Sequence, residues 1–163
     1  MTSSFAMRAR RRVPFVVGAV AVVAAVACGD TPFQVIENTE FDPSLEVDLE
    51  AMERLPSGVY IQDLVIGTGN TVFASSEVTV TYQGYISDGS QFGDGQFNFV
   101  LGTSSVIPGF ELGIIGMYQG GQRKLVIPPE LGYDEEEQTG IPAGSILIFD
   151  VTVDSVFTVD APN

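Results

Sequence analysis

The sequence contains no histidine, no tryptophan and a single cysteine, Cys28. Without histidine, the chain cannot build a histidine-based catalytic triad or a histidine-ligated zinc site. A single cysteine also excludes an internal disulfide and a zinc site made from paired cysteines. The chemistry of this chain therefore depends on aromatic rings, carboxylates, hydroxyls and backbone groups, and we expect it to use no metal and no other cofactor.

Basic residues are also scarce, with seven Lys and Arg against 21 Asp and Glu. Arg8 and the run from Arg10 to Arg12 all precede Cys28, whereas every acidic residue follows it. The chain after Cys28 is therefore strongly acidic, which opposes binding to nucleic acid phosphates and to anionic lipid headgroups. We expect no nucleic acid partner.

Residues 1–27 have the pattern of a secretory signal peptide, because a basic patch precedes an apolar run that ends in small residues. The apolar run, residues 13–27, is shorter than the roughly 20 residues of a spanning helix. It ends in Ala25-Val26-Ala27-Cys28, which resembles the lipobox of bacterial lipoproteins and implies lipid attachment at Cys28. We therefore expect a membrane-anchored lipoprotein of the cell envelope, facing the periplasm or the exterior. An ordinary signal cleaved after Ala27 and an uncleaved anchor remain open.

Residues 28–56 are acidic and have only scattered apolar positions, so we interpret them as a tether. Within it, Leu45, Val47 and Leu49 alternate with acidic residues, which indicates a short strand-like segment docked on the domain. The domain itself is expected at residues 57–158, with a tail at 159–163.

The domain sequence consists of β-rich runs interrupted by glycine, and in one of them Val78, Val80 and Tyr82 alternate with polar residues. A proline and a glycine open the only plausible helix. The expected elements are strands at 59–66, 77–85, 97–101, 123–127 and 145–156, a turn at 87–90 and a helix at 110–117. We predict an α+β fold in which a bent antiparallel β-sheet wraps around one short α-helix.

Six sequence blocks follow one another in a recognisable order: VTYQGY at 80–85, DGSQF at 88–92, FNFVLG at 97–102, VIPGF at 106–110, GGQR at 120–123 and IPPELGY at 127–133. A further block, IPAGS at 141–145, runs into LIFDV at 147–151. In these blocks, residues 57–157 resemble the FKBP family of peptidyl-prolyl cis-trans isomerases. The resemblance implies a roll of the predicted kind, with an aromatic pocket between helix and sheet that receives a prolyl ring.

The resemblance also implies the site residues. The catalytic positions are Tyr82, Phe92, Phe110 and Tyr133, and the substrate-binding positions are Phe97, Val106, Ile107, Ile141 and Phe149. Phe110 stands where the family usually has tryptophan, and the Ile107 N–H and the Tyr133 hydroxyl are expected to bond substrate carbonyls. From the residues alone, Phe97 and Phe149 would equally suit a packed core.

Two features depart from the family pattern. The aspartate that normally follows the residue at Phe92 is replaced by Gly93, and Asp94 comes one position later, where it would face the opposite side of a strand unless a bulge intervened. Tight macrolide binding is thereby put in doubt. The acidic run 134–137 after Tyr133 is either a solvated loop or a rim that favours basic residues beside the substrate proline.

We therefore expect a peptidyl-prolyl cis-trans isomerase, or rotamase, that assists protein folding by acting on X-Pro bonds of exported or envelope proteins. Its partners would be proline-containing polypeptides and the membrane, through the lipid at Cys28, and the protein would be a monomer. The alternative is a non-catalytic FKBP-fold module that binds proline segments at the membrane surface. A purely structural envelope lipoprotein with a degenerate pocket is a third reading.

Overall fold

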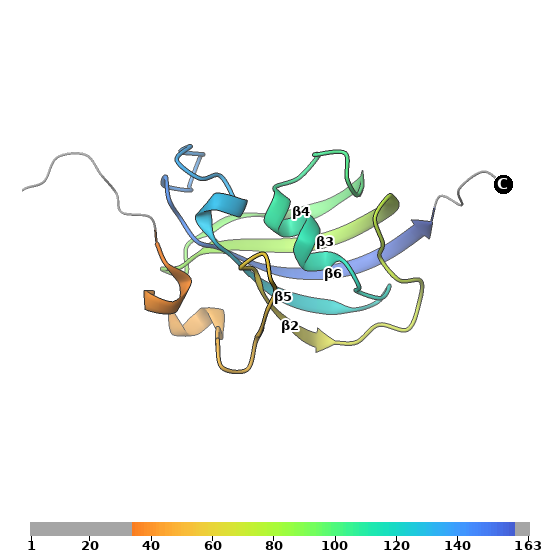
Figure 1. Cartoon of the computed structure of the whole chain (residues 1–163), viewed down its shortest axis with the longest axis horizontal. Helices are drawn as coiled ribbons and strands as arrows, with labels where there is room; N and C mark the ends of the chain where they lie inside the picture. The colour runs from red at the N-terminus through yellow and green to blue at the C-terminus, as the bar shows by residue number, and fades with distance from the viewer. Residues whose placement is uncertain (1–33, 159–163) are drawn as a thin grey trace, which may run out of the picture. The chain divides into compact units, whose positions relative to one another are not determined.

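The computed structural model describes residues 34–158, which form one antiparallel sheet of six strands with a short α-helix across one face (Figure 1). The strand order is β1-β2-β5-β6-β3-β4. The strands are β1 (Glu53–Arg54), β2 (Tyr60–Val65), β3 (Ser76–Ile86), β4 (Gln91–Val100), β5 (Gln122–Ile127) and β6 (Leu147–Thr158), and the helix is α1 (Pro108–Ile114). The predicted fold class is confirmed. The expected signal peptide, the expected lipidation site Cys28 and the expected tail lie outside the described residues.

The centre of the sheet is the long pairing of β3 with β6, which runs from Ser76 opposite Thr158 to Ile86 opposite Leu147. Alternate residues of β3 face the helix, and Val78 and Val80 are completely buried there. Their β-branched side chains fit a pleated surface that is covered on one side. The alternation in the sequence therefore correctly predicted which face of this strand is inside.

The largest differences from the expected element ends are at the start of β4 and at the end of α1, while the other ends differ by at most two residues. Strand β4 begins at Gln91, six residues earlier than expected, because its pairing with β3 continues through Gly93 and Gly95 despite their low β-propensity. Helix α1 ends at Ile114 rather than at residue 117. Gly116 follows with φ of 81°, a left-handed conformation that stops the helix.

Two glycines let α1 lie close against β5. A Cβ atom on Gly109 would come within 2.3 Å of Ile127 Cγ2, and one on Gly113 within 2.7 Å of Leu125 Cδ2. Because these glycines are four residues apart, they share the helix face that meets the sheet. Larger residues there would push α1, and with it Phe110, away from the sheet.

The N-terminal segment, residues 34–54, packs on the outer face of the sheet, opposite α1. It forms two 3₁₀ turns, η1 (Ile36–Asn38) and η2 (Pro43–Leu45), followed by β1. Together with the outer face of the sheet, the segment forms a second hydrophobic cluster, separate from the main core on the α1 side of the sheet. Its buried side chains are Ile36, Leu45, Met52, Tyr60, Val126, Ile146 and Ile148. The segment is therefore folded onto the domain along most of its length rather than forming a tether. The expected docking of Leu45, Val47 and Leu49 is confirmed, but Leu45 lies in a 3₁₀ turn rather than in a strand.

Each of the three basic residues within 34–158 forms an ion pair with a carboxylate. Arg54 lies 3.4 Å from Glu37, Arg123 lies 2.7 Å from Asp63, and Lys124 lies 2.6 Å from Asp150. The Arg123 and Lys124 side chains are almost completely buried, so the ion pairs and hydrogen bonds offset the desolvation of their charges.

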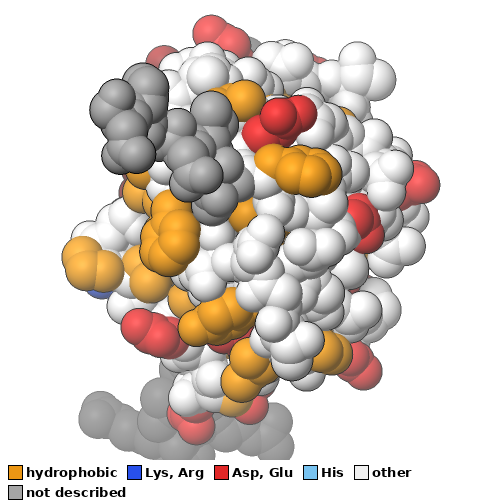
Figure 2. All heavy atoms as spheres, turned by 90° about the vertical axis from the view of Figure 1, so that its right-hand side faces the viewer, with side chains coloured by type: hydrophobic (Ala, Val, Ile, Leu, Met, Phe, Trp, Pro, Cys, Tyr) orange, Lys and Arg blue, Asp and Glu red, His pale blue; other side chains and the backbone are white. Residues whose placement is uncertain are grey.

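Several hydrophobic side chains are exposed at the end of the molecule where β2 and β6 finish, which is the side that Figure 2 faces. They include Val65 at the end of β2, Ile66 directly after it and Phe157 in β6. Acidic groups lie at several places around them in the same view. Within the described residues, no helix combines the length and the apolarity needed to cross a bilayer.

Candidate active site

A cavity of about 260 Å³ lies between α1 and the inner face of the sheet. Eight of the nine expected pocket residues line it, together with one that was not expected. The lining residues are Tyr82, Phe92, Phe97, Ser105, Val106, Ile107, Phe110, Tyr133 and Phe149. They come from β3, β4, β6 and α1, from the connection before α1 and from the connection after β5, so segments far apart in the sequence assemble the cavity.

Four rings form a closed circuit of aromatic contacts around the cavity. The centroid of Tyr82 lies 5.4 Å from that of Phe97, which lies 5.9 Å from Phe110; Phe110 lies 5.2 Å from Phe149. A distance of 6.1 Å between Phe149 and Tyr82 closes the circuit. Edge-to-face pairs such as Phe110 with Phe149, at 82°, are favourable arrangements of aromatic rings. Each wall therefore holds its neighbour in place.

Phe92 joins this circuit through a contact with Phe149, at a centroid distance of 5.5 Å. Its ring lies against Gly84 of β3, where a Cβ atom would come within 2.6 Å of two Phe92 ring carbons. Only glycine at position 84 leaves room for this ring. The sequence reasoning did not assign Gly84 to the site, although a glycine in the interior of a strand indicates a close approach of this kind.

Two polar groups at the cavity are available to a ligand. Ile107 precedes the first residue of α1, and its carbonyl accepts hydrogen bonds from Phe110 and Glu111, whereas no acceptor for its own N–H is found within residues 34–158. Tyr133 is half-buried, and its hydroxyl likewise has no hydrogen-bond partner among the described residues. Both groups are donors that could bond a carbonyl oxygen.

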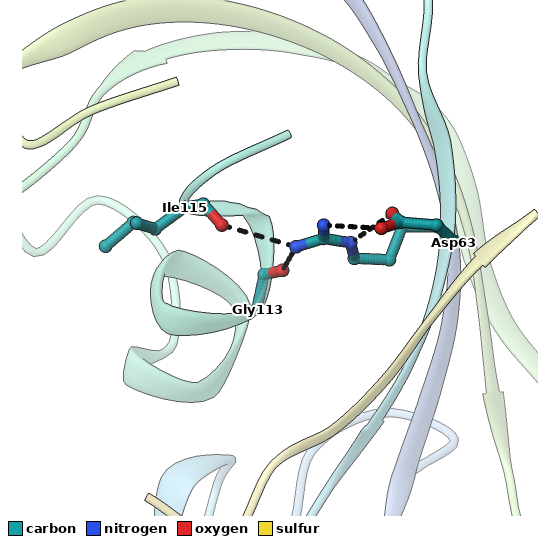
Figure 3. Close-up of polar contacts among 4 residues, drawn as sticks. Asp63, Gly113 and Ile115 are labelled. Carbon is teal, nitrogen blue, oxygen red and sulfur yellow. Dashed lines mark hydrogen bonds and ion pairs between the residues drawn. The ribbon is translucent and has the colours of Figure 1, made fainter. Parts of the chain in front are cut away.

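Arg123 fixes the C-terminal end of α1, as Figure 3 shows. Its Nη1 donates to the carbonyls of Gly113 and Ile115 at 2.8 and 3.2 Å, while its Nε and Nη2 donate to the carboxylate of Asp63 at 2.7 and 3.0 Å. The last carbonyls of a helix lack partners inside the helix, so this guanidinium satisfies them and ties α1 to β2 and β5. The position of Phe110 on α1 depends on this anchor.

The position of Asp94 agrees with the expected one-residue displacement. Gly93 pairs with Gly84 and Asp94 with Gln83, so Asp94 lies on the outer face, where it accepts a hydrogen bond of 3.1 Å from Gln91. A Cβ atom on Gly93 would instead point toward the cavity, 3.6 Å from the Tyr82 hydroxyl. The register shift near Gly84 lies beyond this pair and does not turn Asp94 inward. The cavity therefore lacks a carboxylate at this wall.

Two residues differ from the expected set. Ile141 is 4% exposed and belongs to the main hydrophobic core rather than to the cavity lining. Ser105 lines the cavity and was not expected, because a serine in a Ser- and Gly-rich connection gives no signal for a pocket.

The titratable groups with shifted pKa values lie in turns, in the N-terminal segment and, for Tyr60, at the start of β2. Hydrogen bonds from Ser44 hold the pKa of Asp42 below its usual range, and hydrogen bonds from Ser90 do the same for Asp88. Burial, followed by a hydrogen bond to Glu37, raises the pKa of Tyr60. Within residues 34–158, no group of three or more His, Cys, Asp or Glu side chains is arranged to hold a metal ion.

Comparison with known proteins gives one consistent result. The family model described as "FKBP-type peptidyl-prolyl cis-trans isomerase" matches residues 69–154. Among curated proteins, the chain is 40% identical over 102 residues to FK506-binding protein 4 of Chaetomium thermophilum, covering 60% of this chain and 21% of that protein. It is 39% identical over 106 residues to FK506-binding protein 3 of Candida albicans, covering 63% and 25%. The chain thus spans between a fifth and a quarter of the length of these relatives.

Solved structures agree with the sequence relatives. FkpA from Escherichia coli superposes with a TM-score of 0.61 and 33% identity, covering 67% of this chain and 53% of that one. AtFKBP13 superposes with a TM-score of 0.60 and 29% identity, covering 64% of this chain and 97% of that one.

Proposed function

Because the chain belongs to the family of FKBP-type peptidyl-prolyl cis-trans isomerases, we propose that it isomerises X-Pro peptide bonds in the cavity between α1 and the sheet. The observation that carries this proposal is the closed circuit of Tyr82, Phe97, Phe110 and Phe149 around a cavity of about 260 Å³. A prolyl ring is compact and apolar, and such a cavity accepts it with its peptide bond at the rim.

The chemistry requires no nucleophile and no metal. Rotation about the peptide bond has a barrier of ~18–20 kcal/mol, which arises from amide resonance, and twisting the bond removes that resonance and makes the carbonyl less polar. Aromatic walls that exclude water therefore destabilise the planar amide more than the twisted one. The Ile107 N–H and the Tyr133 hydroxyl hold the neighbouring carbonyls, so that the prolyl ring stays in place while the bond turns.

A protease-coupled assay on an Ala-Leu-Pro-Phe peptide tests the proposal. Spontaneous cis-to-trans conversion takes tens to hundreds of seconds at 25 °C. We expect the chain to make this conversion much faster. Conversion at the spontaneous rate would reject catalysis. If the chain does not catalyse but binds a macrolide pocket ligand, the result would favour the alternative function, a non-catalytic module that holds proline segments. Gly93 and Phe110, which depart from the family pattern, support this alternative.

We further propose that the substrates are exported or envelope proteins with exposed X-Pro bonds. The protein would act on them as a monomer that is anchored to the membrane through a lipid on Cys28. The signal-like leader and its terminal cysteine support this proposal. Only five residues lie between Cys28 and Gln34, which span at most about 22 Å when fully extended. The packed N-terminal segment would therefore keep the domain close to the bilayer.

The substitution Cys28→Ser in the full-length chain tests the anchor. We expect the protein to move from the membrane fraction to the soluble fraction, because two or three acyl chains contribute ~0.8 kcal/mol per buried methylene. Retention of the variant in the membrane fraction would rule out lipidation at this position.

A further inference from the structure

The side chain of Gln34 joins two segments that are far apart in the sequence. Its Oε1 accepts a hydrogen bond of 3.0 Å from the backbone N–H of Ile146, just before β6. Its amide and the hydroxyl of Ser87, in the turn between β3 and β4, exchange hydrogen bonds of 3.1 and 3.2 Å. Gln34 therefore holds the entrance to β6 against the β3–β4 turn.

The backbone of Gln34 connects to the cavity through two further hydrogen bonds. Its N–H donates to the carbonyl of Gly144 at 3.2 Å, and the N–H of Gly144 donates to the carbonyl of Asp134 at 2.7 Å. Asp134 directly follows Tyr133, which lines the cavity. The loop at residues 133–146, here called the rim loop, is thus closed at its base by Gly144 and fastened from outside by Gln34.

The middle of the rim loop touches another cavity wall. Gln138 and Ile141 exchange backbone hydrogen bonds of 3.0 and 2.9 Å, which form a tight turn. At its tip, a Cβ atom on Gly140 would lie 3.6 Å from the Phe92 Cβ. A displacement of the rim loop would therefore move Tyr133 and uncover Phe92 together.

From these contacts we infer that Gln34 is a positioning residue for the cavity, acting through the rim loop on Tyr133 and Phe92. The inference rests on the proposed isomerase function. It lies beyond that function because the family match begins at residue 69, so Gln34 and the N-terminal segment are outside the matched region. Substrate affinity depends on a residue that belongs to this chain's own N-terminal segment.

The affinity effect follows from the population of the binding-competent loop. When only a fraction of the molecules hold the rim loop in place, the apparent dissociation constant rises by the inverse of that fraction. The complex that does form has the loop in its native position, so turnover of bound peptide is unchanged. Loss of Gln34 therefore raises KM and leaves kcat near its original value.

The test compares Gln34→Ala with Gln34→Glu in the full chain. Alanine removes the side-chain hydrogen bonds but retains the backbone bond to Gly144, whereas glutamate retains the acceptor for Ile146 and Ser87. We expect Gln34→Ala to raise KM about three- to tenfold, as the loss of one or two hydrogen bonds implies. Gln34→Glu should restore most of the affinity. Asp48→Ala, which removes only a local hydrogen bond to the Glu50 N–H, is the matched control in the same segment.

Amide hydrogen exchange at Gly144 provides the second measurement, because the acceptor of that N–H is Asp134 and not Gln34. In Gln34→Ala, exchange at Gly144 should accelerate while exchange at the core residue Leu125 stays unchanged. Unchanged KM with unchanged exchange at Gly144 would overturn the inference, and so would faster exchange at both amides, which indicates global destabilisation. If the wild type shows no turnover, the proposed function fails, and exchange at Gly144 still decides whether Gln34 positions the loop.

Discussion

Phe110 is the member of the aromatic circuit that α1 contributes to the cavity. It is 2% exposed, and its ring lies between 5.2 and 6.2 Å from those of Phe97, Phe99 and Phe149. It stands on α1, whereas its three partners come from β4 and β6. Its loss would both open the cavity floor and remove the aromatic contacts between α1 and the sheet.

We predict that Phe110→Ala lowers kcat/KM more than tenfold and lowers the free energy of unfolding by about 3–5 kcal/mol. The isomerase assay, run well below the melting temperature, separates the two effects. Ile114→Val is the control, because Ile114 is fully buried in the same helix but does not line the cavity. It should lower stability by about 0.5–1.5 kcal/mol and leave kcat/KM unchanged. Equal activity of both variants would show that the cavity is not the site.

Gly93 is the residue at which this cavity differs most clearly from the family pattern. Its φ is not left-handed, and a side chain there would enter open space beside the Tyr82 hydroxyl, at 3.6 Å. An aspartate is therefore tolerated by the backbone and directed into the cavity.

We predict that Gly93→Asp tightens the binding of a macrolide ligand by about ten- to 100-fold, the range that one hydrogen bond to a charged group provides. Peptide turnover should change little, since it depends mainly on the apolar walls. Calorimetric titration gives the affinity. Asp94→Asn, on the outer face, is the control and should bind as the wild type does. An unchanged affinity in Gly93→Asp would mean that the new carboxylate does not reach the ligand.

At the scale of single residues, the order of the sequence motifs predicted which residues surround the cavity, but not how closely their side chains approach one another. Tyr82, Phe92 and Phe110 line the cavity as expected because aromatic residues beside turns and glycines keep one face open. Ile141 was misplaced because a buried isoleucine looks the same in a core and in a pocket wall. The role of Gly84 appears only when the Phe92 ring is seen against it.

Among the elements, the strands with alternating apolar residues were predictable, whereas the N-terminal segment was predicted only in part. The paired residues of β3 show a period of two, which is a direct sign of a half-buried strand. In the N-terminal segment, the alternation of Leu45, Val47 and Leu49 correctly indicated docking, but no pattern marks the two 3₁₀ turns or the burial of Ile36. Acidic residues between these contacts made the segment resemble a solvated tether.

The packing of this segment leads to a prediction about Ile36, which is 3% exposed. Ile36→Ala should lower the free energy of unfolding by about 2–5 kcal/mol, as expected for a truncated core isoleucine. Val35→Ala is the matched control, because Val35 is 51% exposed and its truncation should change stability by less than about 0.5 kcal/mol.

Urea unfolding provides the measurement, and a change in midpoint at constant slope is expected for Ile36→Ala. If both variants unfold at the midpoint of the wild type, the segment does not contribute to the fold.

For the molecule as a whole, the dominant property is its acidic surface. The three basic side chains of residues 34–158 are paired with Glu37, Asp63 and Asp150, so none balances the exposed run 134–137 beside the cavity. A peptide that approaches Tyr133 therefore meets negative charge next to the entrance.

We predict that peptides with Lys or Arg beside the proline have a kcat/KM several-fold higher than Glu-flanked peptides at low salt, and that the preference disappears as salt rises. A variant with residues 134–137 neutralised to Asn and Gln should lose the preference. Neutralising Asp48 and Glu50, which lie in the N-terminal segment, should preserve it. Equal turnover of both peptides by the wild type would identify the run as a solvated loop.

The pairing of Lys124 with Asp150 has a practical consequence. Lys124 is the sequence's sole lysine, it is 5% exposed, and its ammonium group lies 2.6 Å from a carboxylate within the sheet. Acylating reagents need an accessible, neutral amine, so the native domain should remain unlabelled at this position. The rate at which Lys124 becomes acylated thus reports directly how often β5 separates from its neighbours.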